Sequence, residues 1–324
     1  MDRLKIGILG CANIAKKSLL PALISPHSKF IVEGIASRSK NKSMELASDY
    51  NCEAYEGYDS LITKGNIDVV YIPLPNALHF EWIMKALDNG IHVLAEKSLS
   101  CSLSETVQIT NKAREKKLAV VENFQFRFHS QLKYISDLVK DNVIGELRSV
   151  RSSFGFPPFD EKENIRYKKE LGGGALFDAG AYPVKISQIF LGENISVQAA
   201  KLHFDNRYDV DTWGGAFLSE DNSSIFSEIA FGFDNFYQCN LELWGSKGKI
   251  VAERIFTAPP GFQPTISFET TEKKETKLLP ADNHFINMLN YLHELILSGS
   301  FEKEHKQNLN QSRLLEEIKE LAKK

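Results

Sequence analysis

The chain has 324 residues, of which 43% are hydrophobic and 25% are charged, as in a globular protein long enough for two domains. A net charge of −3 and a pI near 6.3 give no basic surface for nucleic acid. No apolar run approaches the ~18 residues of a membrane span, and a strand begins too close to the first residue for a signal peptide. We therefore expect a cytoplasmic protein that binds neither nucleic acid nor membrane.

Within the first 120 residues, short apolar runs alternate with segments of helical period. Strands are predicted at 4–9, 30–36, 67–73, 91–96 and 118–123. Helices are predicted between them at 13–25, 40–50, 58–64, 76–89 and 102–117. The apolar runs are continuous rather than alternating, as in a sheet covered on both faces, so a doubly wound parallel α/β sheet is expected over residues 1–123.

The pattern changes in the remaining part, 124–324. A helix is predicted at 129–141, an extended segment at 147–156 and a helical stretch at 173–190. Segments between 196 and 280 alternate apolar and polar residues, which is typical of an antiparallel sheet with one buried face. Helices at 284–297 and 306–322 close the chain. We expect an α+β domain with an open, mostly antiparallel sheet, and the helix at 306–322 is a candidate to pack on the first domain.

A metal site is not expected. The eight histidines are scattered, and the four cysteines form no CxxC pair. Free thiols in a reducing compartment are the better interpretation of these cysteines.

A degenerate dinucleotide-binding fingerprint, "GILGCANIAKK", follows the first strand and opens a helix. Gly10, Ala12 and Ala15 occupy the three glycine places of G-x-G-x-x-G. The helix N-terminus still offers amide donors and the positive end of a dipole to a pyrophosphate. The fingerprint and the parallel-sheet pattern together predict a dinucleotide site whose first turn contains Gly10, Cys11, Ala12, Asn13 and Ile14.

The end of the second strand indicates which dinucleotide binds. An NAD site usually has a carboxylate there for the ribose 2′-hydroxyl, whereas this chain has Ser37 and Arg38. A guanidinium and a hydroxyl suit a 2′-phosphate, which favours NADP(H). The alternative is an ordinary polar loop before the next helix.

Ligands of open α/β sheets bind outside the carboxyl ends of the strands. This rule places Leu74, Asn76 and His79 beside the cofactor, together with Glu96 and Lys97 at the end of "HVLAE". His79 is equally well interpreted as a structural histidine of its helix.

In the second domain, "ELGGGALFDAGAYPVK" carries the candidate acid. Asp178 and Tyr182 are spaced i, i+4 and share a face of a helix. A phenol needs a nearby cation to bring its pKa of about 10 toward neutrality, and Lys97 is the candidate. Pro183 predicts a kink at Tyr182. A buried tyrosine bonded to a buried aspartate is the alternative.

Over its whole length the chain resembles the Gfo/Idh/MocA oxidoreductases. The motifs that carry this resemblance are "GILGCANIA", "IASRS", "YIPLPNALH", "HVLAEKSL", "ENFQFRFH" and "LGGGALFDAGAYPV". The resemblance implies a Rossmann domain followed by a domain with an open sheet, whose outer face often forms a homodimer or homotetramer. It also implies that Lys97 lies near the nicotinamide and that Tyr182 is the acid/base, with Asp178 orienting the substrate.

Within the family, the NADP-dependent nucleotide-sugar 3-ketoreductases are most similar, beside dihydrodiol and xylose dehydrogenases, through further stretches such as "RIFTAPPGFQP". The expected reaction is NADPH-dependent reduction of a ketone on a nucleotide-linked deoxysugar. Arg127, Arg166 and Gln263 are candidates to bind its hydroxyls or diphosphate. The alternatives are an NADP-dependent dehydrogenase of a free sugar or diol, and a non-catalytic NADP-sensing protein.

One residue departs from the family pattern. The proline that follows the family's lysine is Ser98 here. A trans peptide at this position would re-aim Lys97 if the family's Lys-Pro peptide is cis.

Overall fold

The fold is described from a computed structural model, in which residues 3–159, 164–220 and 223–323 are described. The chain divides into two compact units. The first unit comprises Met1–Asn123 and Phe285–Leu309, and the second comprises Phe124–His284 and Asn310–Lys324. Each unit is described by itself.

The first unit contains a six-stranded sheet whose strands all run parallel, in the order β3-β2-β1-β4-β5-β6. Its strands are β1 (Leu4–Leu9), β2 (Phe30–Ser37), β3 (Glu53–Glu56), β4 (Val69–Ile72), β5 (His92–Glu96) and β6 (Val120–Asn123). This topology confirms the predicted Rossmann fold. The strand order reverses between β1 and β4, which is where such sheets bind their ligands.

Helices pack on this sheet because its strands are apolar on both faces. They are η1 (Ala15–Leu19), α1 (Leu20–Leu23), α2 (Lys40–Tyr50), α3 (Tyr58–Lys64), α4 (Asn76–Asp88), α5 (Leu103–Lys116), α8 (His284–Ser298) and the start of α9 (Glu302–Leu321). The Ser102 hydroxyl accepts from the N–H of Glu105 and caps α5, while Lys117, with φ +56°, ends it.

The start of α9 is bound to the chain around β6. His305 Nε2 lies 3.2 Å from the carbonyl oxygen of Leu118, and Asn308 Nδ2 donates to that of Val120 over 2.9 Å. The first unit is therefore completed by residues close to the end of the chain.

The second unit is built on an eight-stranded sheet in the order β14-β13-β12-β11-β7-β10-β9-β8. Its strands are β7 (Leu147–Gly155), β8 (Ile195–Asp205), β9 (Val210–Glu220), β10 (Phe226–Gly232), β11 (Gln238–Gly245), β12 (Gly248–Glu253), β13 (Thr265–Thr270) and β14 (Lys274–Leu278). β7 and β10 pair parallel and the other neighbours pair antiparallel, which confirms the mostly antiparallel sheet.

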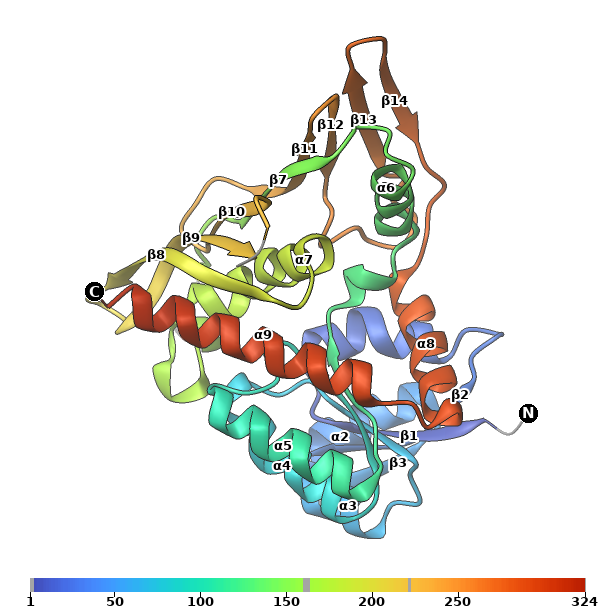
Figure 1. The fold of residues 1–324 in the computed structure, drawn as a ribbon. Helices are drawn as coiled ribbons and strands as arrows, with labels where there is room; N and C mark the ends of the chain where they lie inside the picture. Colours follow the sequence, from blue (N-terminus) through green and yellow to red (C-terminus); the bar gives the residue numbers. More distant parts are fainter. Residues whose placement is uncertain (1–2, 160–163, 221–222, 324) are drawn as a thin grey trace. The chain divides into compact units, whose positions relative to one another are not determined.

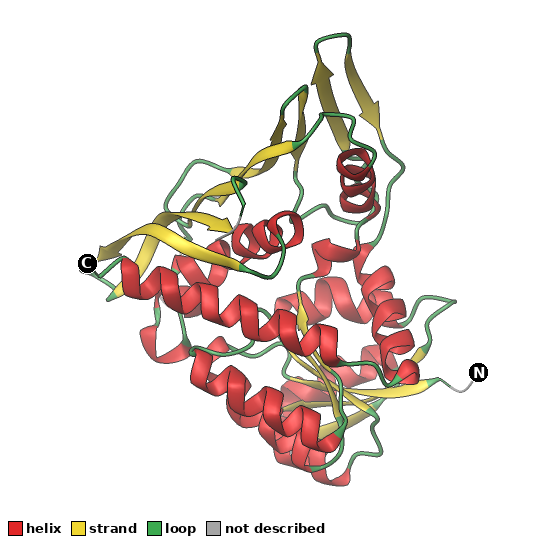
Figure 2. Cartoon of the chain, in the orientation of Figure 1, coloured by secondary structure: helices red, strands yellow, loops and turns green. Residues whose placement is uncertain are grey.

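Helices cover one face of this sheet (Figure 1, Figure 2). They include α6 (Ser130–Lys140) and α7 (Ala181–Leu191), with short helical turns η2 (Gln125–Phe128), η3 (Ile165–Tyr167), η4 (Lys169–Leu171) and η5 (Leu176–Gly180). Leu314, Leu315 and Ile318 of α9 join the apolar core of this unit. Because the strands alternate, their inward side chains form that core and their outward ones remain exposed.

Two further properties concern the described residues. None of their helices has both the length and the apolar composition needed to cross a membrane. They also contain no group of three or more His, Cys, Asp or Glu side chains arranged to hold a metal ion.

Candidate functional site

The turn after β1 requires glycine at position 10. Gly10 has φ +106°, and a Cβ there would lie 3.0 Å from Leu74 Cδ2. Its N–H donates to the carbonyl oxygen of Ala36 over 2.8 Å, which ties the turn to the end of β2. Cys11, Ala12, Asn13 and Ile14 follow, and a helical segment begins there. The structure therefore places these residues at the carboxyl edge of the sheet and at the start of a helical segment, the kind of position where N–H groups can bind an anion.

A cavity of about 540 Å³ in the second unit is lined mainly by charged residues, of which Lys169 pairs with Asp209. A second cavity, of about 320 Å³, lies beside the end of β2 and is the one next to the predicted cofactor turn. It is lined by Cys11, Ser37, Arg38, Ser39, Lys42 and Tyr58.

This β2 cavity combines two cationic side chains with hydroxyl groups, a set that suits a phosphate. Burial raises the pKa of the Tyr58 phenol, and the Arg38 guanidinium offsets part of that effect. Ser37 and Arg38 were predicted from the sequence, whereas Lys42 and Tyr58 were not. Lys42 was recognisable as a cation in the first turn of the helix that follows Arg38, whereas no local pattern indicated Tyr58.

Glu96, the last residue of β5, is held by side chains of both neighbouring strands. It accepts from the Tyr71 hydroxyl over 2.5 Å and from Asn123 Nδ2 over 2.8 Å. Burial raises the pKa of the Glu96 carboxyl, and these two hydrogen bonds and the charge of Lys97 act in the opposite direction. A charged residue can end this buried strand because its carboxylate is hydrogen-bonded inside the protein.

The segment that follows fixes the backbone at Lys97. The Lys97–Ser98 peptide bond is cis. The N–H of Leu99 donates to Glu122 Oε1 over 2.9 Å, and Ser98 and Leu99 are both buried. Lys97 itself is half-buried at the carboxyl edge of the sheet.

His79 lies underneath these loops and is fully buried. Its Nδ1 is 2.8 Å from the Ser98 carbonyl oxygen and its Nε2 is 2.8 Å from that of Leu74. Burial lowers the pKa of His79 to about 4, so the ring is neutral at physiological pH and donates to one of the two carbonyls. His79 thus connects the loops after β4 and β5. Asn76, the first residue of α4, is partly exposed above it.

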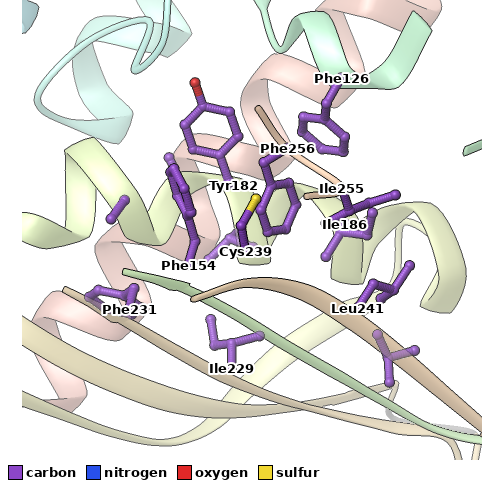
Figure 3. Close-up of a cluster of buried hydrophobic side chains, with 14 of the residues drawn as sticks. Phe126, Phe154, Tyr182, Ile186, Ile229, Phe231, Cys239, Leu241, Ile255 and Phe256 are labelled. Carbon is purple, nitrogen blue, oxygen red and sulfur yellow. The ribbon is translucent and has the colours of Figure 1, made fainter. Parts of the chain in front are cut away.

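In the second unit, Tyr182 lies in a cluster of aromatic rings. Its ring centroid is between 5.0 and 5.9 Å from those of Phe124, Phe126, Phe154 and Phe256. Figure 3 shows its phenol oxygen directed away from the sheet, beyond the apolar cluster. The ring is therefore fixed by packing while its polar end projects out of the core.

The helix around Tyr182 departs from the predicted shape. The α-helical segment α7 starts at Ala181 and continues through Tyr182 and Pro183. The irregularity lies one turn earlier, where η5 forms a π-helical turn that contains Asp178. The kink expected at Tyr182 is thus replaced by a wider turn before it, in the region where Pro183 lacks an N–H to donate.

Asp178 is engaged by Arg166. Arg166 Nε donates to Asp178 Oδ2 over 2.6 Å, and the Asp178 side chain is 15% exposed. The guanidinium carbon lies 4.6 Å from the ring centroid of Phe159. The carboxylate and the guanidinium are therefore oriented as a pair one helical turn from Tyr182.

The structure places the other two substrate candidates elsewhere in the second unit. Arg127 lies in η2, with its guanidinium carbon 5.2 Å from the ring centroid of Phe128. Gln263 is exposed in the loop between β12 and β13. Their roles remain predictions.

Comparison with known proteins identifies the family to which the chain belongs. Residues 4–124 match the family model described as "Oxidoreductase family, NAD-binding Rossmann fold", and residues 132–251 match that of the GFO/IDH/MocA C-terminal domain. The chain is 38% identical over 279 residues to a dTDP-3,4-didehydro-2,6-dideoxy-alpha-D-glucose 3-reductase of Streptomyces violaceoruber, with 86% of this chain and 81% of the relative covered. It is 35% identical to the protein of the same name from Actinomadura kijaniata, with 98% and 95% covered.

A solved structure extends this similarity to the fold. A 3-ketoreductase from Actinomadura kijaniata, in complex with NADP and TDP-benzene, has a TM-score of 0.93 and 34% identity, with 98% of each chain covered. The same relative has been solved with a tyrosine replaced by phenylalanine, and with a lysine replaced by alanine or by glutamate. The two family models, and relatives this similar over almost the whole length, show that the chain belongs to the Gfo/Idh/MocA family of oxidoreductases.

Proposed function

We propose that this protein reduces a ketone on a nucleotide-linked deoxysugar and uses NADPH as the reductant. The observation that carries the proposal is the similarity, over 98% of both chains, to a 3-ketoreductase bound to NADP and TDP-benzene. The chain has the residue types that such a reaction needs, because Lys97, Asp178 and Tyr182 stand where the family pattern has its lysine, aspartate and acid/base.

The first unit fits the cofactor. Gly10, with φ +106°, forms the tight turn after β1 that the first glycine of a dinucleotide fingerprint forms. Arg38 and Lys42, with the hydroxyls of Ser37 and Ser39, would hold the 2′-phosphate in the β2 cavity. NADPH, when bound, supplies the hydride for the reduction. The nicotinamide end of the cofactor would lie against the edge of the sheet that carries Leu74, Asn76, Glu96 and Lys97.

Side chains of the protein then neutralise or stabilise the negative charge that develops on the ketone oxygen. Tyr182 donates its phenolic proton to that oxygen as the alcohol forms. Lys97 stabilises the developing negative charge and the phenolate left on Tyr182. Asp178 orients a substrate hydroxyl, and Glu96 supports the strand end that carries Lys97.

Arg166 is our candidate for recognition of the diphosphate. Its Nε is engaged by Asp178, and its Nη1 lies 3.4 Å from Asn164 Oδ1. A guanidinium oriented in this way can present its remaining N–H groups to phosphate oxygens. Arg127 and Gln263 would serve the more distant parts of the nucleotide.

The outer face of the larger sheet is proposed to bind a second copy of the chain. Trp213, Trp244 and Phe217 are exposed there. Arg151 pairs with Glu228 on one side and Glu242 on the other, so the face carries both charges beside its aromatic rings. A surface that is apolar and internally charge-balanced suits self-association into a homodimer or homotetramer.

The test of the reaction follows NADPH consumption at 340 nm. Substrates are a dTDP-linked 3-keto-deoxysugar, free ketoses and aldoses, and dihydrodiols in the oxidative direction with NADP. Tyr182→Phe and Lys97→Met are assayed beside the wild type, with Tyr134→Phe as the matched control for loss of a hydroxyl. We expect turnover of the nucleotide-linked ketone that falls at least 100-fold in Tyr182→Phe and is retained in Tyr134→Phe.

The rival functions predict different results. Turnover confined to free sugars or diols would replace the proposal with the dehydrogenase alternative. Tight binding of NADPH without turnover of any carbonyl compound would favour the sensing protein. Full activity of Tyr182→Phe would show that another group supplies the proton.

A further inference from the structure

Asp211, on β9, holds the backbone of the segment that leads to Tyr182. It is 8% exposed, and its Oδ2 accepts from the N–H of Leu176 over 2.6 Å. Its carboxylate also receives the N–H of Ala175. Asp211 lies 35 residues after Leu176 in the sequence, so a strand of the sheet supplies the cap of this helical segment.

Gly174, just before this segment, lies close against the carboxylate of Asp211. Gly174 has φ +111°, and a Cβ at this position would lie 2.3 Å from Asp211 Oδ1. Both the backbone conformation and the space therefore require glycine. Residues 174–176 and the Asp211 carboxylate form one close contact, which we call the Asp211 clamp.

The Asp211 clamp sits at the start of the wide turn that presents both candidate groups. The N–H of Asp178 donates to the carbonyl oxygen of Gly174 over 3.1 Å, so the first turn starts at the clamped residue. The π-helical turn η5 then leads directly into α7 at Ala181. The clamp therefore holds the residue at which the π-helical turn begins, and single π-helical turns of this kind occur mostly at functional sites.

The charge on Asp211 is itself tuned by this contact. Burial raises the pKa of the carboxyl to about 6, and the backbone N–H donors and Lys319 of α9 oppose that shift. A buried carboxylate with several N–H donors is a stronger acceptor than an amide oxygen. An asparagine of equal size would offer one acceptor, its amide oxygen. Its NH2 group would then face the second backbone N–H, which would lose its acceptor.

We propose that Asp211 is a positioning residue for the reduction, which sets the rotational phase of the helix that carries Asp178 and Tyr182. The inference rests on the proposed function, because that function gives Asp178 and Tyr182 roles that depend on their position. It adds a residue outside every motif that carries the family resemblance.

The experiment combines kinetics with amide hydrogen exchange. Asp211→Asn and Gly174→Ala disturb the clamp from its two sides. Asp209→Asn, at an exposed aspartate just before β9, is the matched control. Amide exchange of residues 172–182 is measured without cofactor, and kcat and the NADPH dissociation constant are measured with a dTDP-linked 3-keto-deoxysugar. The double variant completes a thermodynamic cycle.

We expect faster exchange at Ala175 and Leu176 and a kcat lower by roughly 10- to 100-fold in either single variant, because small misplacement of a catalytic group has effects of this size. NADPH affinity should remain within about twofold, since the cofactor residues belong to the first unit. The double variant should lose no more than the worse single variant, because both substitutions break one contact.

Three results would overturn the inference. Unchanged exchange in both single variants would show that the clamp does not hold the segment. Faster exchange with a wild-type kcat, while Tyr182→Phe is inactive, would remove the positioning role and leave the proposed function intact. A wild-type kcat in Tyr182→Phe would show that another group supplies the proton, and it would overturn this inference because Tyr182 would then need no positioning. If Asp211→Asn does not fold, Gly174→Ala gives the same measurements.

Discussion

Arg166 Nε donates to Asp178 Oδ2 over 2.6 Å while the guanidinium lies over the ring of Phe159. This pair joins a long, cationic side chain to the helix that carries the candidate acid. It means that any group bound by Arg166 is positioned relative to Asp178 and, through the helix, to Tyr182.

Replacing Arg166 should therefore weaken substrate binding more than cofactor binding. In Arg166→Met we expect the KM for the nucleotide-linked ketone to rise about 10- to 100-fold, since a hydrogen bond to a charged group contributes about 1.5–3 kcal/mol. Steady-state kinetics and NADPH fluorescence titration would measure the two effects. Arg148→Met, an exposed arginine in the same unit, is the control, and equal loss of NADPH affinity in Arg166→Met would contradict the assignment.

Selectivity for NADPH over NADH should depend on the β2 cavity. Arg38→Ala and Lys42→Ala are each expected to weaken NADPH binding about 10- to 100-fold and to change NADH binding little, because only NADPH carries the 2′-phosphate. Fluorescence titration with both cofactors gives the ratio. Lys40→Ala tests whether a cation nearby but outside the cavity lining matters, and an equal loss there would indicate a general effect of charge.

The neutral, buried His79 should make stability depend on pH. Its folded-state pKa of about 4 lies below the unfolded value of 6.5, so the unfolded chain binds more protons between these values. The contribution of His79 to the free energy of unfolding should thus be largest above pH 6.5 and decrease as the pH drops toward 4. Between pH 7.5 and 5 the decrease should be about 2 kcal/mol.

Urea denaturation at these two pH values, for the wild type and His79→Gln, isolates this contribution, because His284 and the other groups remain in both proteins. His27→Gln, at an exposed position, is the control. The assignment fails if His79→Gln loses as much stability on acidification as the wild type.

Self-association through the outer face of the larger sheet should be sensitive to one charge placed among its exposed aromatic rings. Trp213→Glu is expected to shift the protein from dimer or tetramer to monomer in sedimentation velocity, while its thermal unfolding changes little, because this side chain is 43% exposed in the single chain. Lys274→Glu, on the edge strand β14, supplies the comparison. A monomeric wild type would remove the proposal outright.

The sequence was most informative where one local pattern determined the structure. Continuous apolar runs predicted five strands of the first sheet to within about two residues of their observed ends, because both faces of that sheet are buried. The short strand β3, "EAYE", was missed because charged residues flank its two central positions. Strand and helix patterns also located the candidate side chains Lys97 and Tyr182.

Features that depend on distant parts of the chain were not predictable in this way. Asp211 stands in "DVDTWGG" like any surface aspartate, and only the folded sheet brings it to Leu176. Three successive glycines, such as those after Leu171, allow close approach of a ligand, of another domain or of neighbouring backbone, and the sequence does not distinguish these cases. In the structure a Cβ on Gly173 would meet the carbonyl oxygen of Arg166 at 2.5 Å, so that glycine admits neighbouring backbone.

The division of α9 has a consequence for biosynthesis. The part of α9 up to Leu309 belongs to the first unit, although the strands of that unit end at Asn123. While the ribosome is still making the second sheet, the carbonyl oxygens of Leu118 and Val120 lack the partners that His305 and Asn308 later provide. The nucleotide-binding unit can therefore reach its final state only after residues 285–309 have been synthesised, and the strands of the second sheet precede these residues in the chain.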